Sequence, residues 1–134
     1  MQIKRAYSAS PYEKSIGFCR AIRVGQQIHL AGTAAFDETG QVFAAGDAYR
    51  QACRCLEIAT AALATLDADM SQTYRIRWYL TDMSQQVDVA RAHQEHFIDH
   101  PPVATMLGVQ ALVDPGLCVE LELEAWVDSH LTPN

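Results

Sequence analysis

Hydrophobic and polar residues alternate most regularly near the end of the chain, between positions 117 and 127. One side of this stretch is apolar and consists of Leu117, Val119, Leu121, Leu123, Ala125 and Val127. The other side carries Cys118, Glu120, Glu122, Glu124 and Trp126. A period of two residues predicts a β-strand with one buried face. The segment before it, from His100 onward, predicts another strand, and Asp114-Pro115-Gly116 predicts a turn between the two.

Two segments have the spacing of helices. Asp47 is a favourable N-cap, and apolar residues then recur every three or four positions until about Asp67: Tyr49, Ala52, Cys53, Leu56, Ala59, Leu63 and Leu66. Ser84 should cap a second helix, which Pro101 and Pro102 end. Its expected inner side consists of Val87, Ala90, Gln94 and Phe97.

The remaining strands surround these helices. Residues 18–24 and 27–31 predict a hairpin that turns at Gly25-Gln26, and residues 3–7 predict a short edge strand. Residues 73–83 predict a strand with one face made of Tyr74, Ile76, Trp78 and Leu80, and another made of Thr73, Arg75, Arg77 and Tyr79. The order of elements predicts one α+β domain over residues 1–134, with both helices on one face of the sheet.

The other face of this sheet carries mostly polar groups, namely His29, Arg75, Arg77, Tyr79, Glu120, Glu122, Glu124 and Trp126. An antiparallel sheet often leaves one face in water. Tyr79 and Trp126 are large and partly apolar, however, and the arginines of one strand lie in phase with the glutamates of another. These features favour a subunit interface over open solvent.

Composition narrows the functional classes. The chain is 49% hydrophobic and carries a net charge of −6. No apolar run approaches the roughly 20 residues of a membrane-spanning helix, and the acidic charge weighs against a nucleic acid or an anionic membrane as partner. The four cysteines do not suggest a disulfide framework. With no targeting segment in sight, we expect a cytoplasmic protein with reduced thiols.

Four segments together resemble a known family. They are SPYEKSIGFCRAIRVGQQIHLAGTA (10–34), YRIRWYLTDM (74–83), HPPVATM (100–106) and VELELEAW (119–126), and they are similar to the RidA/YjgF/YER057c/UK114 family. The resemblance implies a chorismate-mutase-like fold with a mixed sheet, and a homotrimer with small-molecule pockets between subunits. The best-known members hydrolyse reactive enamines and imines to keto acids and ammonia.

The resemblance assigns roles to individual positions. Gly32 matches a glycine that serves as a backbone donor, and Glu120 matches the strand glutamate. The arginine that holds the substrate carboxylate in deaminating members is replaced by Ala104. The family's pocket cysteine, helix asparagine and hairpin tyrosine are replaced in turn by Met106, Ala90 and Phe18. The chain therefore resembles a subgroup that lacks the arginine.

The loss of the guanidinium has a direct physical consequence. A guanidinium binds a carboxylate through two charge-assisted hydrogen bonds, and alanine supplies neither. We therefore expect poor deamination of 2-iminopropionate, unless another cation such as Arg20 reaches the pocket. Cys19, Thr33 and Thr105 are further candidates to line it.

Glu120 is the candidate catalytic residue. In a half-enclosed pocket it could activate water, whereas on an open sheet it would be an exposed residue or an ion-pair partner of Arg75 or Arg77. The expected function is a hydrolase of deaminase type acting on a small imine-, enamine- or amide-like metabolite. The alternative is a non-catalytic trimer that binds a ligand or another protein.

The histidines and Cys19 give weaker indications of a functional site. His93, His96 and His100 have the spacing of a metal site, but the prolines that follow should unwind the helix there, so solvated or interface histidines are favoured. Cys19 could be a modifiable thiol beside Arg20, although a small packed residue is favoured. We expect no metal and no cofactor.

Overall fold

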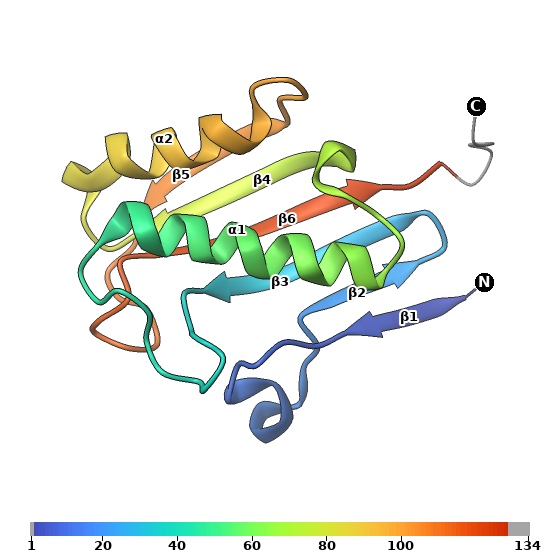
Figure 1. Cartoon of the computed structure of the whole chain (residues 1–134), viewed down its shortest axis with the longest axis horizontal. Helices are drawn as coiled ribbons and strands as arrows, with labels where there is room; N and C mark the ends of the chain where they lie inside the picture. The colour runs from blue at the N-terminus through green and yellow to red at the C-terminus, as the bar shows by residue number, and fades with distance from the viewer. Residues whose placement is uncertain (1, 129–134) are drawn as a thin grey trace.

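The computed structural model describes residues 2–128, so residues 1 and 129–134 of the predicted single domain lie outside the described part. Its strands are β1 (Ile3–Ala6), β2 (Ala21–Val24), β3 (Gln27–Ala34), β4 (Thr73–Leu80), β5 (Val103–Gly108) and β6 (Val119–Trp126). Its longer helices are α1 (Ala48–Thr65) and α2 (Gln86–Phe97), and both lie on the same face of the sheet (Figure 1). Short helical turns span Glu13–Gly17, Met70–Gln72 and Met83–Gln85.

The strands form one mixed sheet with the order β1-β2-β3-β6-β4-β5. Strand β6 lies between β3 and β4 and runs antiparallel to both, whereas β5 runs parallel to β4 at the edge. The α+β fold with a mixed sheet is therefore confirmed. The strands on either side of the Asp114-Pro115-Gly116 turn, β5 and β6, are not neighbours, because residues 109–118 carry the chain past β4.

The alternation in β6 is confirmed. Every second side chain from Leu117 to Val127 is buried, and these groups form the core together with Ile76, Trp78 and Leu80 of β4. Helix α1 crosses this face of the sheet (Figure 1) and begins after Asp47, whose side chain accepts a hydrogen bond from the Arg50 backbone N–H at 3.0 Å. The burial of α1 against the central strand fixes which face of the sheet stays open.

Two details of the predicted core are wrong. The β4–β6 register shifts between Thr73 and Arg75, and this irregularity buries Thr73 and leaves Tyr74 41% exposed. Strict alternation had placed Tyr74 in the core. In α1, Cys53 packs partly buried against the core, as expected of the apolar stripe, but the stripe also contains Cys55, which is fully buried and was not predicted there.

The inner side of α2 also differs from the prediction. Asp82, not Ser84, caps the turn before the helix, because its side chain accepts a hydrogen bond from the Ser84 backbone N–H at 2.9 Å. Val89, Ala92 and Phe97 are buried, and of the predicted inner residues only Phe97 is among them. The exposed ones are Val87, Ala90 and Gln94. Apolar residues are sparse in α2, and the half-buried His93 and His96 complete the inward stripe.

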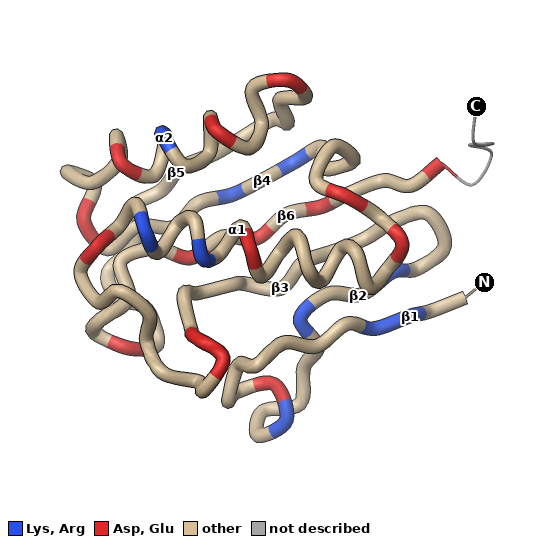
Figure 2. The backbone as a smooth tube through the Cα atoms, viewed as in Figure 1, with Lys and Arg blue, Asp and Glu red and all other residues tan. Residues whose placement is uncertain are grey.

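Charged residues of β4 and β6 lie on neighbouring strands of the open face, as the blue and red positions in Figure 2 show. Arg77 Nη1 lies 3.1 Å from Glu124 Oε2 and 3.7 Å from Glu122 Oε1, and the Tyr79 hydroxyl donates a hydrogen bond to Glu122. The in-phase arrangement of β4 arginines and β6 glutamates is confirmed. Trp126 is 49% exposed on the same face. No helix within residues 2–128 is long and apolar enough to cross a membrane.

A buried glutamine joins α1 to the loop before β6. The Gln51 side-chain amide donates to the Gly116 carbonyl at 2.9 Å and accepts from the Cys118 backbone N–H at 2.7 Å. We predict that Gln51→Ala lowers the free energy of unfolding by roughly 2–4 kcal/mol, since it leaves buried backbone groups without partners. Urea unfolding of the full chain measures this loss.

Gln94→Ala is the matched control, because Gln94 lies on the exposed side of α2. Its expected effect is within about 0.5 kcal/mol. Equal losses for the two variants would show that the Gln51 contacts contribute nothing specific.

Candidate functional site

A buried ion pair holds the segment before β2 against the sheet. Arg20 Nε lies 3.0 Å from Glu13 Oε2, and both side chains are almost fully buried. The Ser8 backbone N–H donates to Glu13 Oε1 at 2.8 Å. Arg20 Nη1 donates to the Gly32 carbonyl at 2.5 Å and to Thr33 Oγ1 at 3.1 Å. These contacts attach residues 8–20 to β3 and form one side of a cavity.

Strand β3 is irregular at this point. Its register with β6 shifts between Leu30 and Thr33, so the pairing is interrupted at Ala31-Gly32. The Glu120 side chain lies against Gly32. It is so close that a Cβ atom added at Gly32 would lie 2.2 Å from Glu120 Oε2, which is a clash. Only a glycine lets this carboxylate approach the β3 backbone so closely.

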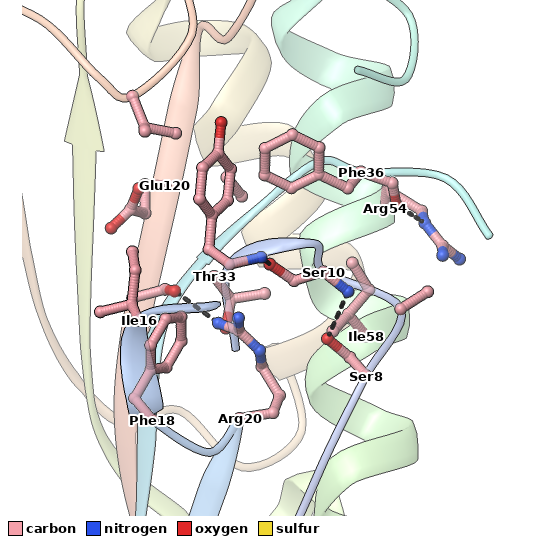
Figure 3. A pocket seen from close by; sticks show the side chains of 15 residues that line it. Ser8, Ser10, Ile16, Phe18, Arg20, Thr33, Phe36, Arg54, Ile58 and Glu120 are labelled. Atoms are coloured by element: carbon pink, nitrogen blue, oxygen red, sulfur yellow. Dashed lines mark hydrogen bonds between the residues drawn. The ribbon is translucent and has the colours of Figure 1, made fainter. Parts of the chain in front are cut away.

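The cavity has a volume of about 210 Å³. Its walls come from the segment before β2, from β3, from α1 and from the start of β6 (Figure 3). They are mostly hydrocarbon: Tyr12, Ile16, Phe18, Phe36, Ile58 and Val113. Tyr12 and Phe36 pack with their ring centroids 5.8 Å apart. A small ligand with an apolar body fits such a site.

Glu120 contributes a carboxylate to this lining. Burial raises the pKa of its carboxyl, while the nearby charge of Arg20 lowers it and Glu122 raises it. Among residues 2–128, Glu120 accepts no hydrogen bond, unlike Glu122 and Glu124 on the same strand. An unpaired carboxylate beside an apolar cavity can accept a proton from water or bind a hydrogen-bond donor of a ligand.

A second, smaller hollow of about 160 Å³ lies between α2 and strands β4 and β5. It is lined by Trp78, Ala90, His93, Ala104, Thr105 and Met106. The Trp78 indole N–H donates to His93 Nδ1 at 3.0 Å. Burial and the neighbouring His96 lower the pKa of His93, which favours the neutral imidazole that accepts this bond.

The chain is similar to known proteins over most of its length. A family model described as Endoribonuclease L-PSP matches residues 9–127. The chain belongs to the Endoribonuclease L-PSP family. The crystal structure of Rv2704 from Mycobacterium tuberculosis, described as a member of the YjgF/YER057c/UK114 family, shares 32% identity with a TM-score of 0.85, and the match covers 94% of this chain and 100% of that one.

The chain is also similar in sequence to two other bacterial proteins. The uncharacterized protein SCO2049 of Streptomyces coelicolor is 37% identical over 125 residues, which is 92% of each chain. The RutC family protein y4sK of Sinorhizobium fredii is 29% identical over 105 residues, which is 78% of this chain and 82% of that protein.

Within this Endoribonuclease L-PSP family member, the predicted ligand-binding residues divide between two places. Phe18, Gly32, Thr33 and Glu120 line the first cavity. Ala90, Ala104, Thr105 and Met106 line the second. Cys19 lines neither, and lies instead in a shallow hollow on the surface with Lys14 and His29. A single chain therefore does not bring all the predicted ligand-binding residues together in one cavity.

Two predicted side chains are already engaged. The Thr33 hydroxyl donates to the Ala31 carbonyl at 2.8 Å and accepts from Arg20, so it holds the wall together. Arg20, the candidate replacement for the missing arginine, lines the cavity but directs Nε and Nη1 to Glu13, Gly32 and Thr33. Glu13, which holds Arg20, was missed because nothing in its sequence context marks it as buried.

The histidines take different environments. His93 bonds Trp78, and the His96 ring nitrogen Nδ1 lies 3.2 Å from the Ala92 carbonyl. His100 follows α2, and its ring packs edge-on to Phe97. Within residues 2–128 no group of three or more His, Cys, Asp or Glu side chains is arranged to hold a metal ion.

The electrostatics of Glu120 predict a pH-dependent stability effect. A folded-state pKa above the ordinary 4.5 means that the folded chain holds this proton more tightly than the unfolded chain. The ionised carboxylate therefore costs stability as pH rises above that value. We predict that Glu120→Gln is more stable than the wild type at neutral pH, and that this gain disappears in acid, where both states are protonated.

Denaturant unfolding across this pH range measures the effect. Glu122→Gln is the control, since Glu122 accepts a hydrogen bond from Tyr79 and lies near Arg77, so its removal should bring no gain. A loss of stability for Glu120→Gln at neutral pH would show that this carboxylate has a stabilising partner.

Proposed function

We propose that the chain acts as a cytoplasmic homotrimer that binds and hydrolyses a small imine-, enamine- or amide-like metabolite. In this assembly the open sheet face is buried, and the Glu120 cavity of one subunit meets the Ala104 hollow of the next. Exposed apolar groups support it: Val103 and Leu107 on β5 and Trp126 on β6. Family membership supports the same class of assembly.

The environment of Glu120 is the observation that supports the proposed hydrolysis. Its carboxylate is half-buried, accepts no hydrogen bond within residues 2–128 and lies beside the irregular stretch of β3 at Gly32. A raised pKa brings a carboxyl nearer to the range in which it exchanges protons efficiently. Backbone groups near Gly32 and Thr33 would stabilise the charge that develops on the substrate.

The reaction proceeds by addition of water. As the water oxygen bonds to the imine carbon, Glu120 accepts one of its protons. Glu120 then delivers that proton to the substrate nitrogen, which gives a carbinolamine. As the carbon–nitrogen bond breaks, Glu120 takes the proton of the new hydroxyl group and passes it to the nitrogen, so ammonia leaves and a carbonyl product remains. The protein itself supplies every group in this sequence, so no cofactor is invoked.

The Ala104 position sets the substrate range. In a subgroup that lacks the arginine, the hollow beside Ala90, Ala104 and Met106 offers hydrocarbon where a carboxylate would need a cation. The favoured metabolite therefore has no obligatory carboxylate, and 2-iminopropionate is a poor substrate. The alternative function is a trimer that binds a ligand or another protein without catalysis, which the engaged Thr33 and Arg20 side chains favour.

An assay with two imines tests this function. An amine oxidase acting on benzylamine supplies benzaldimine, and an amino-acid oxidase acting on alanine supplies 2-iminopropionate. We predict accelerated hydrolysis of the first, and a fall of about 10²–10⁴ in that rate for Glu120→Gln, since general base catalysis typically contributes this much. Benzaldehyde and ammonia release are the readouts.

Glu122→Gln is the matched control and should retain the wild-type rate, because its carboxylate lies outside the cavity lining. If sedimentation shows an intact trimer but every imine is hydrolysed only at the uncatalysed rate, the enzymatic function is refuted. The non-catalytic binding trimer then remains.

A substitution at Ala104 tests the substrate range separately. We predict that Ala104→Arg raises hydrolysis of 2-iminopropionate by about tenfold or more, because each hydrogen bond to a charged group contributes roughly 1.5–3 kcal/mol. Ala104→Met adds similar length without charge and should bring no gain. An unchanged rate for the arginine variant would show that the missing guanidinium is not what limits this substrate.

A further inference from the structure

Among the described residues 2–128, the charged side chains that line the first cavity are engaged with partners, except Glu120. Arg20 and Glu13 form a buried ion pair at 3.0 Å. Arg54 donates from Nε to the Phe36 carbonyl at 2.8 Å and lies 3.2 Å from Glu57, and in Figure 3 its guanidinium points away from the cavity. Glu120 accepts no hydrogen bond from any residue of the described chain. The cavity therefore presents one uncompensated negative charge.

The walls suit a cation with an apolar body. Tyr12, Phe18 and Phe36 offer aromatic surface, and aromatic rings attract cations through their negative faces. The Arg20 guanidinium already lies 5.4 Å from the centroid of the Phe18 ring. An ionised carboxylate is less stable in an apolar wall than in water. A ligand cation that donates a hydrogen bond to the carboxylate offsets this loss of hydration.

The cavity volume indicates how large a group fits beside Glu120. A cavity of about 150 Å³ holds one benzene molecule. The volume here is about 210 Å³, which leaves room for one ring and a one-carbon ammonium or iminium group. An anionic ligand of the same size would meet Glu120, and the two arginines that residues 2–128 contribute to the lining are already bonded to other groups.

We propose that this cavity selects a small cationic ligand, a protonated imine or primary amine with an apolar substituent, which donates hydrogen bonds to Glu120. The inference rests on the proposed function and specifies its substrate class. Water also adds more readily to an iminium ion than to a neutral imine, so cation binding brings the reactive form to the residue that activates water.

Three probes with the same ring test the charge preference. Benzylamine is a cation at neutral pH, benzyl alcohol is neutral and benzoate is an anion. Titration of the full chain, followed by protein-observed NMR, measures each affinity. We expect benzylamine to bind roughly tenfold to a hundredfold more tightly than benzyl alcohol, in the range of a charge-assisted hydrogen bond, and benzoate to bind most weakly.

Two variants assign the preference to one carboxylate. Glu120→Gln should reduce benzylamine affinity to that of benzyl alcohol while leaving the alcohol unchanged. Glu122→Gln removes an equal charge from the same strand and should retain the amine preference. Benzoate binding as tightly as benzylamine to the wild type, or an amine preference that survives Glu120→Gln, would overturn the proposal.

The binding test and the hydrolysis assay can refute the charge preference and the catalytic function independently. Benzylamine bound through Glu120 without hydrolysis of any imine would refute catalysis and leave the charge preference standing. Hydrolysis of imines by a cavity that prefers benzoate would refute the charge preference and leave catalysis standing.

Discussion

The structure depends on β6, a central strand that lies between β3 and β4. Its backbone is hydrogen-bonded to β3 and to β4, so its alternating side chains divide the molecule into a buried side and an open side. The apolar side receives α1 and forms the core. The polar side holds the three glutamates at fixed intervals, and a slip of one residue would exchange the two faces.

The three glutamates have unequal environments because β3 and β4 differ. Glu122 and Glu124 face Arg77 and Tyr79 of β4, and their charges are compensated within the chain. Glu120 lies where β3 departs from regular pairing, against Gly32 and beside a cavity. Burial raises its pKa, and Arg20, whose charge is balanced by Glu13, offsets this only in part. A group that costs stability in this way is typical of a functional site.

The sequence predicted the features that depend on local periodicity. The α1 cap at Asp47, the buried side of β6 and the matching of Arg77 with the β6 glutamates all follow from spacing along one segment. The inner side of α2 did not follow, because few apolar residues mark it. The burial of Thr73 in place of Tyr74 did not follow either, since a register shift breaks the alternation there. Both errors come from tertiary packing that overrides a weak local pattern.

The candidate site was predictable only in part for a similar reason. Phe18, Gly32 and Glu120 were recognised from their motifs, and they do line one cavity. The buried Glu13 that holds Arg20, and the contribution of α1 and Val113 to the walls, depend on segments far apart in the sequence. Sequence spacing also could not show that Ala104 and Glu120 line separate cavities within one chain.

The most direct test is a site-resolved carbon NMR titration of the Glu120 carboxyl, with and without benzylamine. Because burial disfavours the charged form and an ammonium group would favour it, the pKa should lie above the ordinary 4.5 in the free protein and fall when benzylamine binds. An ordinary pKa that benzylamine leaves unchanged would contradict the account.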